Sequence, residues 1–200
     1  MYSVFLAVIL GFMPLSAMAK SLLVFGDSIS AGYGIDVELG WVNLLQQKFN
    51  QLQMDHVVYN ESISGDTSAS GLSRIDQALS KHNPDIVMLE LGANDGLRGL
   101  SPQQMKSNLT EMIRRCRQTG AEVLLLGMKL PPNYGKRFVD MFYNVYPQLA
   151  EELKTPLVPF ILEDVALKPE LMQLDGLHPN ALGQPPIVET IWPYLKPLLN

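Results

Sequence analysis

The chain has 200 residues, of which 47% are hydrophobic and 18% are charged, a balance that supports one folded core and excludes global disorder. The formal net charge of -5 leaves no positive field to attract a phosphate backbone, so we expect no nucleic-acid partner. A single cysteine cannot form an internal disulfide, and three histidines beside it leave little material for a structural zinc site.

The N-terminal segment has the composition of an export signal. Residues 4–13 form a short apolar run, and Ala17 and Ala19 stand at the two positions that a signal peptidase reads. The run is shorter than the roughly 20 apolar residues that span a bilayer as a helix, although no Lys or Arg precedes it. We predict a signal peptide over residues 1–19, cleavage before Lys20 and a periplasmic or secreted protein. A buried first helix or an uncleaved anchor is the alternative.

After this segment, apolar runs of strand length alternate with amphipathic helical patterns. Strands are predicted at 21–25, 56–59, 86–91, 123–128 and, from a weaker pattern, 157–160; helices are predicted at 42–50, 72–81, 102–119, 137–154 and a last one ending near 199. Ser101 and Gln104 form a capping-box pattern, with Pro102 at the first helical position and Gly120 as the stop. Unbroken Val, Ile and Leu strands indicate a sheet covered on both faces. We therefore predict one α/β domain over 20–200, a three-layer α/β/α sandwich around a parallel sheet of about five strands.

Four polar segments that contain glycine follow predicted strands or open the last helix. They are residues 26–30, 60–66, 92–96 and 175–180. Each alone is also ordinary turn chemistry. Ligands of parallel sheets bind beyond the carboxyl ends of the strands, so the four segments together predict a site at that edge.

The polar segments contain the groups that acyl transfer needs. Ser28 offers a hydroxyl at a strand-to-helix turn, and His178 is the best candidate for the base that takes its proton. Asp175, three residues earlier, is close enough to orient the imidazole. The competing histidines His56 and His82 are expected at the surface. Alternatively, His178 is a non-catalytic surface residue at the start of the last helix.

An oxyanion requires hydrogen-bond donors, and one residue type is informative here. Asn94 carries an NH2 group where an aspartate would offer only acceptors. The backbone N–H groups of Ser28 and Gly65 would complete the oxyanion hole, because glycine permits close approach of the main chain. Three neighbouring aspartates are expected to brace the loops by hydrogen bonding rather than to take part in chemistry: Asp27, Asp66 and Asp95.

These residues resemble the four blocks of the SGNH, or GDSL, hydrolase superfamily. The blocks are Gly26-Asp27-Ser28, Gly65, Gly92-Ala93-Asn94-Asp95 and Asp175-Gly176-Leu177-His178, and residues 96–100 and 130–135 resemble its bacterial periplasmic thioesterase, lysophospholipase and arylesterase branch. The resemblance covers most of 20–200. It implies a flavodoxin-like fold, no cofactor and no metal, and a flexible loop near 96–100 that closes over an acyl chain. As a departure, Pro185 and Pro186 stand so early in the last helix that we expect it to begin late or to bend.

The resemblance also implies an activity. We expect a serine hydrolase that cleaves carboxylic esters and thioesters of acyl chains, lysophospholipids included, through an acyl-enzyme on Ser28. The partner is then a small-molecule acyl ester or thioester, and we expect a monomer with no stable membrane span. A carbohydrate O-deacetylase of the same superfamily and a non-catalytic lipid-binding protein are the alternatives.

Apolar residues near the polar segments are candidates for an acyl-chain slot. We expect this slot to be lined by Ile29, Leu97, Leu100, Leu130 and Tyr134. Phe138, Met141 and Phe142 have the helical spacing of core residues instead. Cys116 lies among arginines, which would favour a thiolate, but it is remote from the polar segments and we expect no catalytic role.

Overall fold

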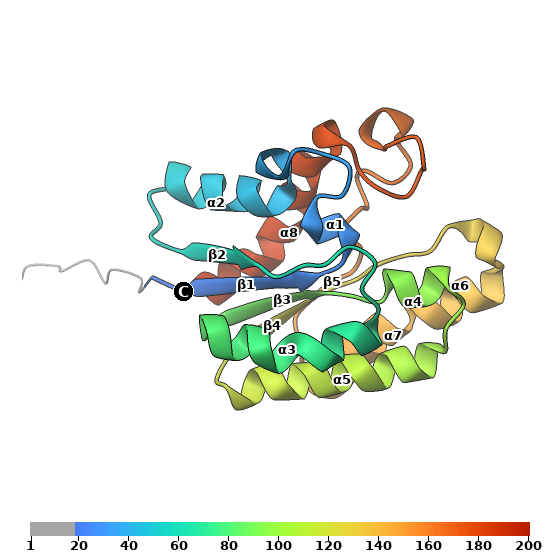
Figure 1. Ribbon diagram of the computed structural model, residues 1–200, viewed down its shortest axis with the longest axis horizontal. Coiled ribbons are helices and arrows are strands. Elements are labelled where there is room, and N and C mark those ends of the chain that lie inside the picture. The colour runs from blue at the N-terminus through green and yellow to red at the C-terminus, as the bar shows by residue number, and fades with distance from the viewer. Residues whose placement is uncertain (1–18) are drawn as a thin grey trace, which may run out of the picture.

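A computed structural model describes residues 19–200 of the chain (Figure 1). The predicted signal peptide therefore lies outside the described residues, apart from its last residue, Ala19. No helix within the described part of the chain is both long enough and apolar enough to cross a membrane.

A five-stranded parallel sheet forms the centre of the molecule, as predicted. Its strands are β1 (Ser21–Gly26), β2 (Val57–Asn60), β3 (Ile86–Glu90), β4 (Glu122–Leu126) and β5 (Leu157–Val158). They lie in the order β2-β1-β3-β4-β5, and every neighbouring pair is parallel. Because β3 is buried along its whole length and β1 and β4 along all but their first residue, helices must cover both faces.

The α-helices form two layers around the sheet, which confirms the three-layer sandwich. They are α1 (Ser28–Ala31), α2 (Trp41–Gln51), α3 (Ser68–His82), α4 (Ala93–Leu97), α5 (Pro102–Gln118), α6 (Lys136–Tyr143), α7 (Val145–Leu153) and α8 (Gln184–Leu195). Figure 1 shows α2 and α8 on one face and α3, α5 and α7 on the other. The short helices α1 and α4 lie at the carboxyl end of the sheet, where the polar segments were expected to meet.

Two local predictions about helices need correction. The predicted helix 137–154 is two helices, α6 and α7, because Pro147 lacks an N–H and cannot continue the hydrogen-bond ladder of α6. Ser101 caps α5 by accepting from the Gln104 N–H at 3.3 Å, but the Gln104 side chain donates to Asn108 instead of completing the capping box. The last helix begins late, as expected: residues 181–183 form a 3-10 turn, and α8 starts at Gln184, so that Pro185 and Pro186 fall in a first turn that needs no N–H donors.

Burial contradicts the surface positions expected for two histidines and agrees with the expectation that Cys116 is not catalytic. His56 is buried, not at the surface, and its ring packs edge-on against Phe49 while Nδ1 accepts from the Lys20 backbone N–H at 3.0 Å. His82 is partly buried between Tyr59 and Glu61. Burial raises the pKa of the Cys116 thiol to about 12, so the nearby arginines do not produce a thiolate.

Candidate active site

The nucleophile candidate stands where β1 passes into α1. Ser28 is the first residue of α1, and the preceding Asp27 caps this helix by accepting from the Ile29 N–H at 3.1 Å. Position 26, which precedes Asp27, requires glycine, because an added Cβ would lie 2.6 Å from Glu90 Oε2 and 2.9 Å from Ser30 Oγ. The first residue of the Gly-Asp-Ser sequence thus makes room for a carboxyl group on the neighbouring strand.

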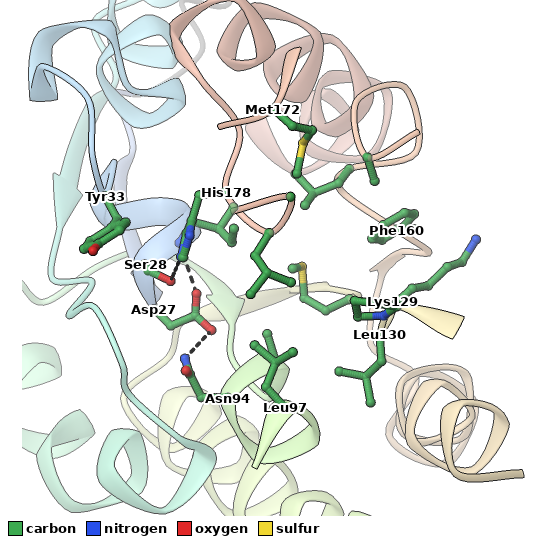
Figure 2. Close-up of a pocket in the computed structure, with 18 of the residues that line it drawn as sticks. Asp27, Ser28, Tyr33, Asn94, Leu97, Lys129, Leu130, Phe160, Met172 and His178 are labelled. Carbon is green, nitrogen blue, oxygen red and sulfur yellow. Dashed lines mark hydrogen bonds between the residues drawn. The ribbon is translucent and has the colours of Figure 1, made fainter. Parts of the chain in front are cut away.

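The structure brings Ser28, His178 and Asp175 into one hydrogen-bonded line, of which Figure 2 shows the Ser28–His178 pair. His178 Nε2 lies 2.8 Å from Ser28 Oγ, and His178 Nδ1 lies 2.7 Å from Asp175 Oδ2. A carboxylate can only accept, so Nδ1 carries the hydrogen and Nε2 presents a lone pair to the serine hydroxyl. This is the tautomer in which an imidazole can remove the serine proton.

The turn that holds the base is shaped by Asp175 itself. Its Oδ1 accepts from the N–H groups of Leu177 at 2.9 Å and His178 at 3.0 Å, while Oδ2 reaches the imidazole. Burial alone would raise the pKa of Asp175, but these hydrogen bonds together lower it to about 2. Asp175 therefore stays ionised opposite the imidazole throughout the neutral range. The Tyr33 ring packs against His178 at 4.7 Å between centroids, a contact that the sequence patterns did not indicate.

The predicted oxyanion donors meet beside Ser28. Asn94 Nδ2 donates to Asp27 Oδ2 at 3.1 Å and to the Asp66 carbonyl at 3.0 Å. Because both partners are acceptors, the nitrogen of this amide, not its oxygen, faces them. Gly65 adopts a φ of +86°, the left-handed region that glycine enters without strain, and its N–H has no acceptor within residues 19–200.

The three aspartates predicted to brace the loops do so. Asp27 binds the Ile29 N–H and the Asn94 amide, as described above. Asp66 forms an ion pair with Arg74 at 2.6 Å. Asp95 accepts from the Ser68 backbone N–H at 2.7 Å. Each of the three polar segments is thereby tied to another part of the fold.

A further acid, Glu90, lies behind this corner and was missed in the sequence. It is the last residue of β3, fully buried, and its Oε2 accepts from Ser30 Oγ at 2.8 Å and from the Asp27 N–H at 3.3 Å. Burial, then repulsion by Asp27, raises the pKa of Glu90 well above its usual value, and burial raises the pKa of Asp27 to about 6. A lone charged residue closing an otherwise apolar strand was the signal that could have identified it.

A cavity of about 670 Å³ opens beside the Ser28–His178 pair and is lined mostly by apolar side chains. Figure 2 shows Leu97, Leu130, Phe160 and Met172 on the side away from His178. Of the five predicted slot residues, Ile29, Leu97 and Leu130 line this cavity.

Two predicted slot residues, Leu100 and Tyr134, are not among the residues that line the cavity. Leu100 follows α4 and is 44% exposed, and Tyr134 is 37% exposed with its hydroxyl donating to the Leu97 carbonyl at 3.2 Å. Of the residues predicted as core, Phe142 is buried but Met141 is exposed, because α6 is a separate surface helix.

Within residues 19–200, no three or more His, Cys, Asp or Glu side chains gather closely enough to hold a metal ion. The Ser28, His178 and Asn94 arrangement can instead supply proton transfer and hydrogen-bond donors. The site therefore offers side-chain chemistry suited to acyl transfer next to an apolar cavity.

Comparisons with known proteins point to the same chemistry. The GDSL-like Lipase/Acylhydrolase family model matches residues 24–184. The chain is 51% identical over 183 residues to the esterase TesA of Pseudomonas aeruginosa, with 92% of this chain and 91% of the relative covered. It is 45% identical over 185 residues to thioesterase 1/protease 1/lysophospholipase L1 of Escherichia coli K12, with 92% and 88% covered.

A solved structure extends the comparison to three dimensions. The esterase EstA from a psychrotrophic Pseudoalteromonas species, inhibited by monoethylphosphonate, superposes with a TM-score of 0.87 at 42% identity. The match covers 90% of this chain and 99% of that protein. The family model and these relatives span nearly all of the described residues, and the chain belongs to the GDSL-like lipase/acylhydrolase family.

Proposed function

We propose that the protein is a serine hydrolase that cleaves carboxylic esters and thioesters of acyl chains through an acyl-enzyme on Ser28. The single observation that carries this proposal is the hydrogen-bonded line from Ser28 through His178 to Asp175 at the mouth of an apolar cavity. Relatives named as an esterase and as a thioesterase and lysophospholipase support the choice of bond.

The first half-reaction transfers the acyl group to the enzyme. Ser28 Oγ attacks the substrate carbonyl carbon while His178 Nε2 takes the hydroxyl proton. Asp175 stabilises the imidazolium that forms. When the tetrahedral intermediate collapses, the bond to the alkoxide or thiolate leaving group breaks, and His178 returns the proton to that group.

The second half-reaction releases the acid. A water molecule gives a proton to His178 and attacks the acyl-enzyme carbonyl. When the second tetrahedral intermediate collapses, the bond to Ser28 Oγ breaks, His178 returns the proton to Ser28 Oγ, and a carboxylic acid leaves. In both intermediates the oxyanion receives hydrogen bonds from the Ser28 and Gly65 N–H groups and from Asn94. One hydrogen of the Asn94 NH2 group stays on the Asp27 carboxylate, because this hydrogen bond is charge-assisted and the stronger of the two. The other hydrogen, which points to the neutral Asp66 carbonyl, is shared between that carbonyl and the oxyanion.

The cavity determines the class of acyl group. Leu97, Leu130, Phe160 and Met172 present no hydrogen-bonding group to a sugar or a short polar acyl group. The charged Lys129 and Glu163, which also line the cavity, pair with each other at 2.9 Å. At roughly 0.8 kcal/mol per buried CH₂, several methylenes of a fatty chain would contribute substantial binding free energy here. We therefore propose medium or long acyl esters, including lysophospholipids, rather than acetylated carbohydrates.

We further propose export after cleavage before Lys20, and a monomeric enzyme. The uncharged leader with small residues at 17 and 19 supports export, and a site assembled from a single chain supports a monomer. Mass spectrometry of the exported protein should give an N-terminus at Lys20, and an intact Met1 would refute cleavage. Light scattering on the purified protein should give the mass of one chain.

The test of the activity is labelling with an organophosphonate followed by substrate profiling. The wild-type protein should gain one phosphonyl group on Ser28, and Ser28→Ala should gain none. Aryl esters, acyl thioesters and lysophospholipids should all be hydrolysed, with rates that rise with chain length. An unlabelled wild-type protein would favour a lipid carrier, and a strict preference for acetyl esters would favour the O-deacetylase.

A further inference from the structure

Asn94 depends on a buried carboxylate for its orientation. Its NH2 group holds two hydrogens, and one of them points at Asp27 Oδ2 at 3.1 Å. The other goes to the backbone carbonyl of Asp66 at 3.0 Å. In Figure 2 the Asp27 carboxylate lies between Asn94 and the Ser28–His178 pair. Asp27 is therefore the side chain that fixes the direction of this amide.

The surroundings of Asp27 suit an acceptor of this kind. Asp27 is 1% exposed, and its other oxygen accepts from the Ile29 N–H, the N–H directly after Ser28. One carboxylate thus joins the turn that carries the nucleophile to the amide that faces the oxyanion. Because no solvent reaches it, this link has a single geometry, as precise positioning of a donor requires.

Glu90, which lies behind Asp27, carries the proton of this pair of buried acids, and Asp27 carries the negative charge. Glu90 Oε1 is buried without a hydrogen-bond partner within the described residues, which would be costly for an ionised carboxylate. Asp27, in contrast, receives a hydrogen bond at each oxygen. Two adjacent buried acids cannot both ionise readily, so the proton resides on Glu90 and the negative charge on Asp27.

We propose that Asp27 is a positioning residue of the reaction: its carboxylate holds the Asn94 amide in the orientation that donates to the oxyanion. This inference rests on the hydrolase function proposed above. It assigns to the aspartate of the Gly-Asp-Ser sequence a role beyond bracing the loop.

Several charged or titratable groups surround Asp27, and their effects can be separated. Glu90 on β3 and Tyr146 on α7 lie behind it, and burial raises the pKa of both. Asp66 is paired with Arg74 from α3, and its charge raises the pKa of Asp27 only slightly. His178 acts in the opposite direction and lowers the pKa of Asp27.

The kinetic test compares Asp27→Asn with Asp95→Asn. Asp95 is another buried aspartate, in α4, that binds Ser68 and not Asn94, so Asp95→Asn is a control for the loss of a structural hydrogen bond at a buried aspartate. With a short soluble aryl ester, Asp27→Asn should lower kcat tenfold to a hundredfold and leave KM within about twofold. Asp95→Asn should lower Tm with a much smaller loss of kcat.

A double-mutant cycle tests whether Asp27 acts through Asn94. Asn94→Ala alone should lose about a hundredfold or more in kcat, and adding Asp27→Asn should cost less than threefold further. Losses that multiply fully would overturn the proposal, as would an unchanged kcat in Asp27→Asn. A wild-type protein that neither hydrolyses esters nor reacts with a phosphonate would instead refute the proposed function.

A spectroscopic measurement on the wild-type protein avoids any variant that fails to fold. The side-chain NH2 resonances of Asn94, assigned by their absence in Asn94→Ala, should shift with pH through a midpoint near the pKa of Asp27, about 6. In His178→Ala the shift should persist with a higher midpoint, because the imidazolium no longer lowers the pKa of Asp27. Resonances that neither shift between pH 4 and 8 nor change position in Asp27→Asn would overturn the proposal, whatever the enzymatic activity.

Discussion

The two ends of the cavity are built in opposite ways. At one end, a polar corner of Asp27, Ser28, Asn94, Asp175 and His178 is joined by hydrogen bonds of 2.7 to 3.1 Å. At the other end, an apolar wall comes mainly from α4 and from the segments after β4 and β5 (Figure 2). No directional bond fixes the position of a ligand along that wall.

This difference separates chemistry from selectivity. Each polar side chain has a defined partner, so a single substitution should leave a charge or a donor without its partner and cost several kcal/mol. Each apolar side chain contributes mainly contact area, so its loss should change binding gradually. The polar corner should therefore be intolerant of change, and the apolar wall should be tunable.

The largest expected effect is that of Asp175→Asn. The amide would present donor hydrogens or a neutral oxygen to His178 Nδ1, so the tautomer that leaves Nε2 free for Ser28 would no longer be enforced. We expect kcat to fall on the order of 10³–10⁴-fold while the fold is retained. Steady-state kinetics with an aryl ester checks this, with circular dichroism for the fold.

The neighbouring Leu174→Ser is the matched control for Asp175→Asn. Leu174 belongs to the same turn but its side chain is fully exposed and does not line the cavity. The Leu174→Ser variant should hydrolyse a soluble ester at a rate within about twofold of wild type. Equal losses in both variants would mean that the turn as a whole, and not the carboxylate, determines the rate.

A smaller effect is expected from Gly65→Ala, which tests the backbone part of the oxyanion hole. The nearest atom to an added Cβ is Arg98 Nη2 at 3.7 Å, so no clash arises, but the φ of +86° disfavours any side chain. Strain of about 1–2 kcal/mol should rotate the peptide or destabilise the loop. We expect a tenfold to hundredfold loss in kcat with little change in KM; full activity would remove Gly65 from the oxyanion hole.

The sequence located the polar corner well because its chemistry demands particular residue types. Ser28, Asp175 and His178 supply a hydroxyl, a carboxylate and an imidazole in the chain order expected for acyl transfer. The end of β1 and the turn before α8 bring them together. Glu90 was missed because an apolar strand pattern gives no account of what its last side chain contacts. Met172, from the segment after β5, was missed since no motif marks that segment and only the folded chain brings it to the cavity.

The pH dependence of stability tests whether Glu90 carries the proton. Folded Glu90 keeps a proton that the unfolded chain releases above about pH 4.5, so the folded state loses relative stability as the pH rises. The expected loss is about 1.4 kcal/mol per pH unit until the raised pKa is reached. Asp27 adds a similar loss only up to about pH 6.

Replacing Glu90 by Gln should remove this slope above pH 6. Glutamine retains an acceptor for the Ser30 hydroxyl and cannot ionise. Urea unfolding of both proteins between pH 6 and 7.5 measures the difference. If wild type and Glu90→Gln lose stability equally over this range, Glu90 is ionised in the folded protein and the assignment of the proton is wrong.

The smallest effects belong to the apolar wall, and two leucines three residues apart allow a direct test. Leu97 ends α4 and lines the cavity, whereas Leu100 lies outside it with 44% of its surface exposed. Leu97→Ala should lower kcat/KM for long acyl esters about threefold to tenfold through lost contact area, with little effect on acetyl or butyryl esters. Leu100→Ala should leave the chain-length profile unchanged. Were Leu100→Ala to reduce long-chain activity as much as Leu97→Ala, the segment after α4 would have to fold over bound substrate, and the original sequence-based assignment of Leu100 to the acyl slot would be correct for the bound state.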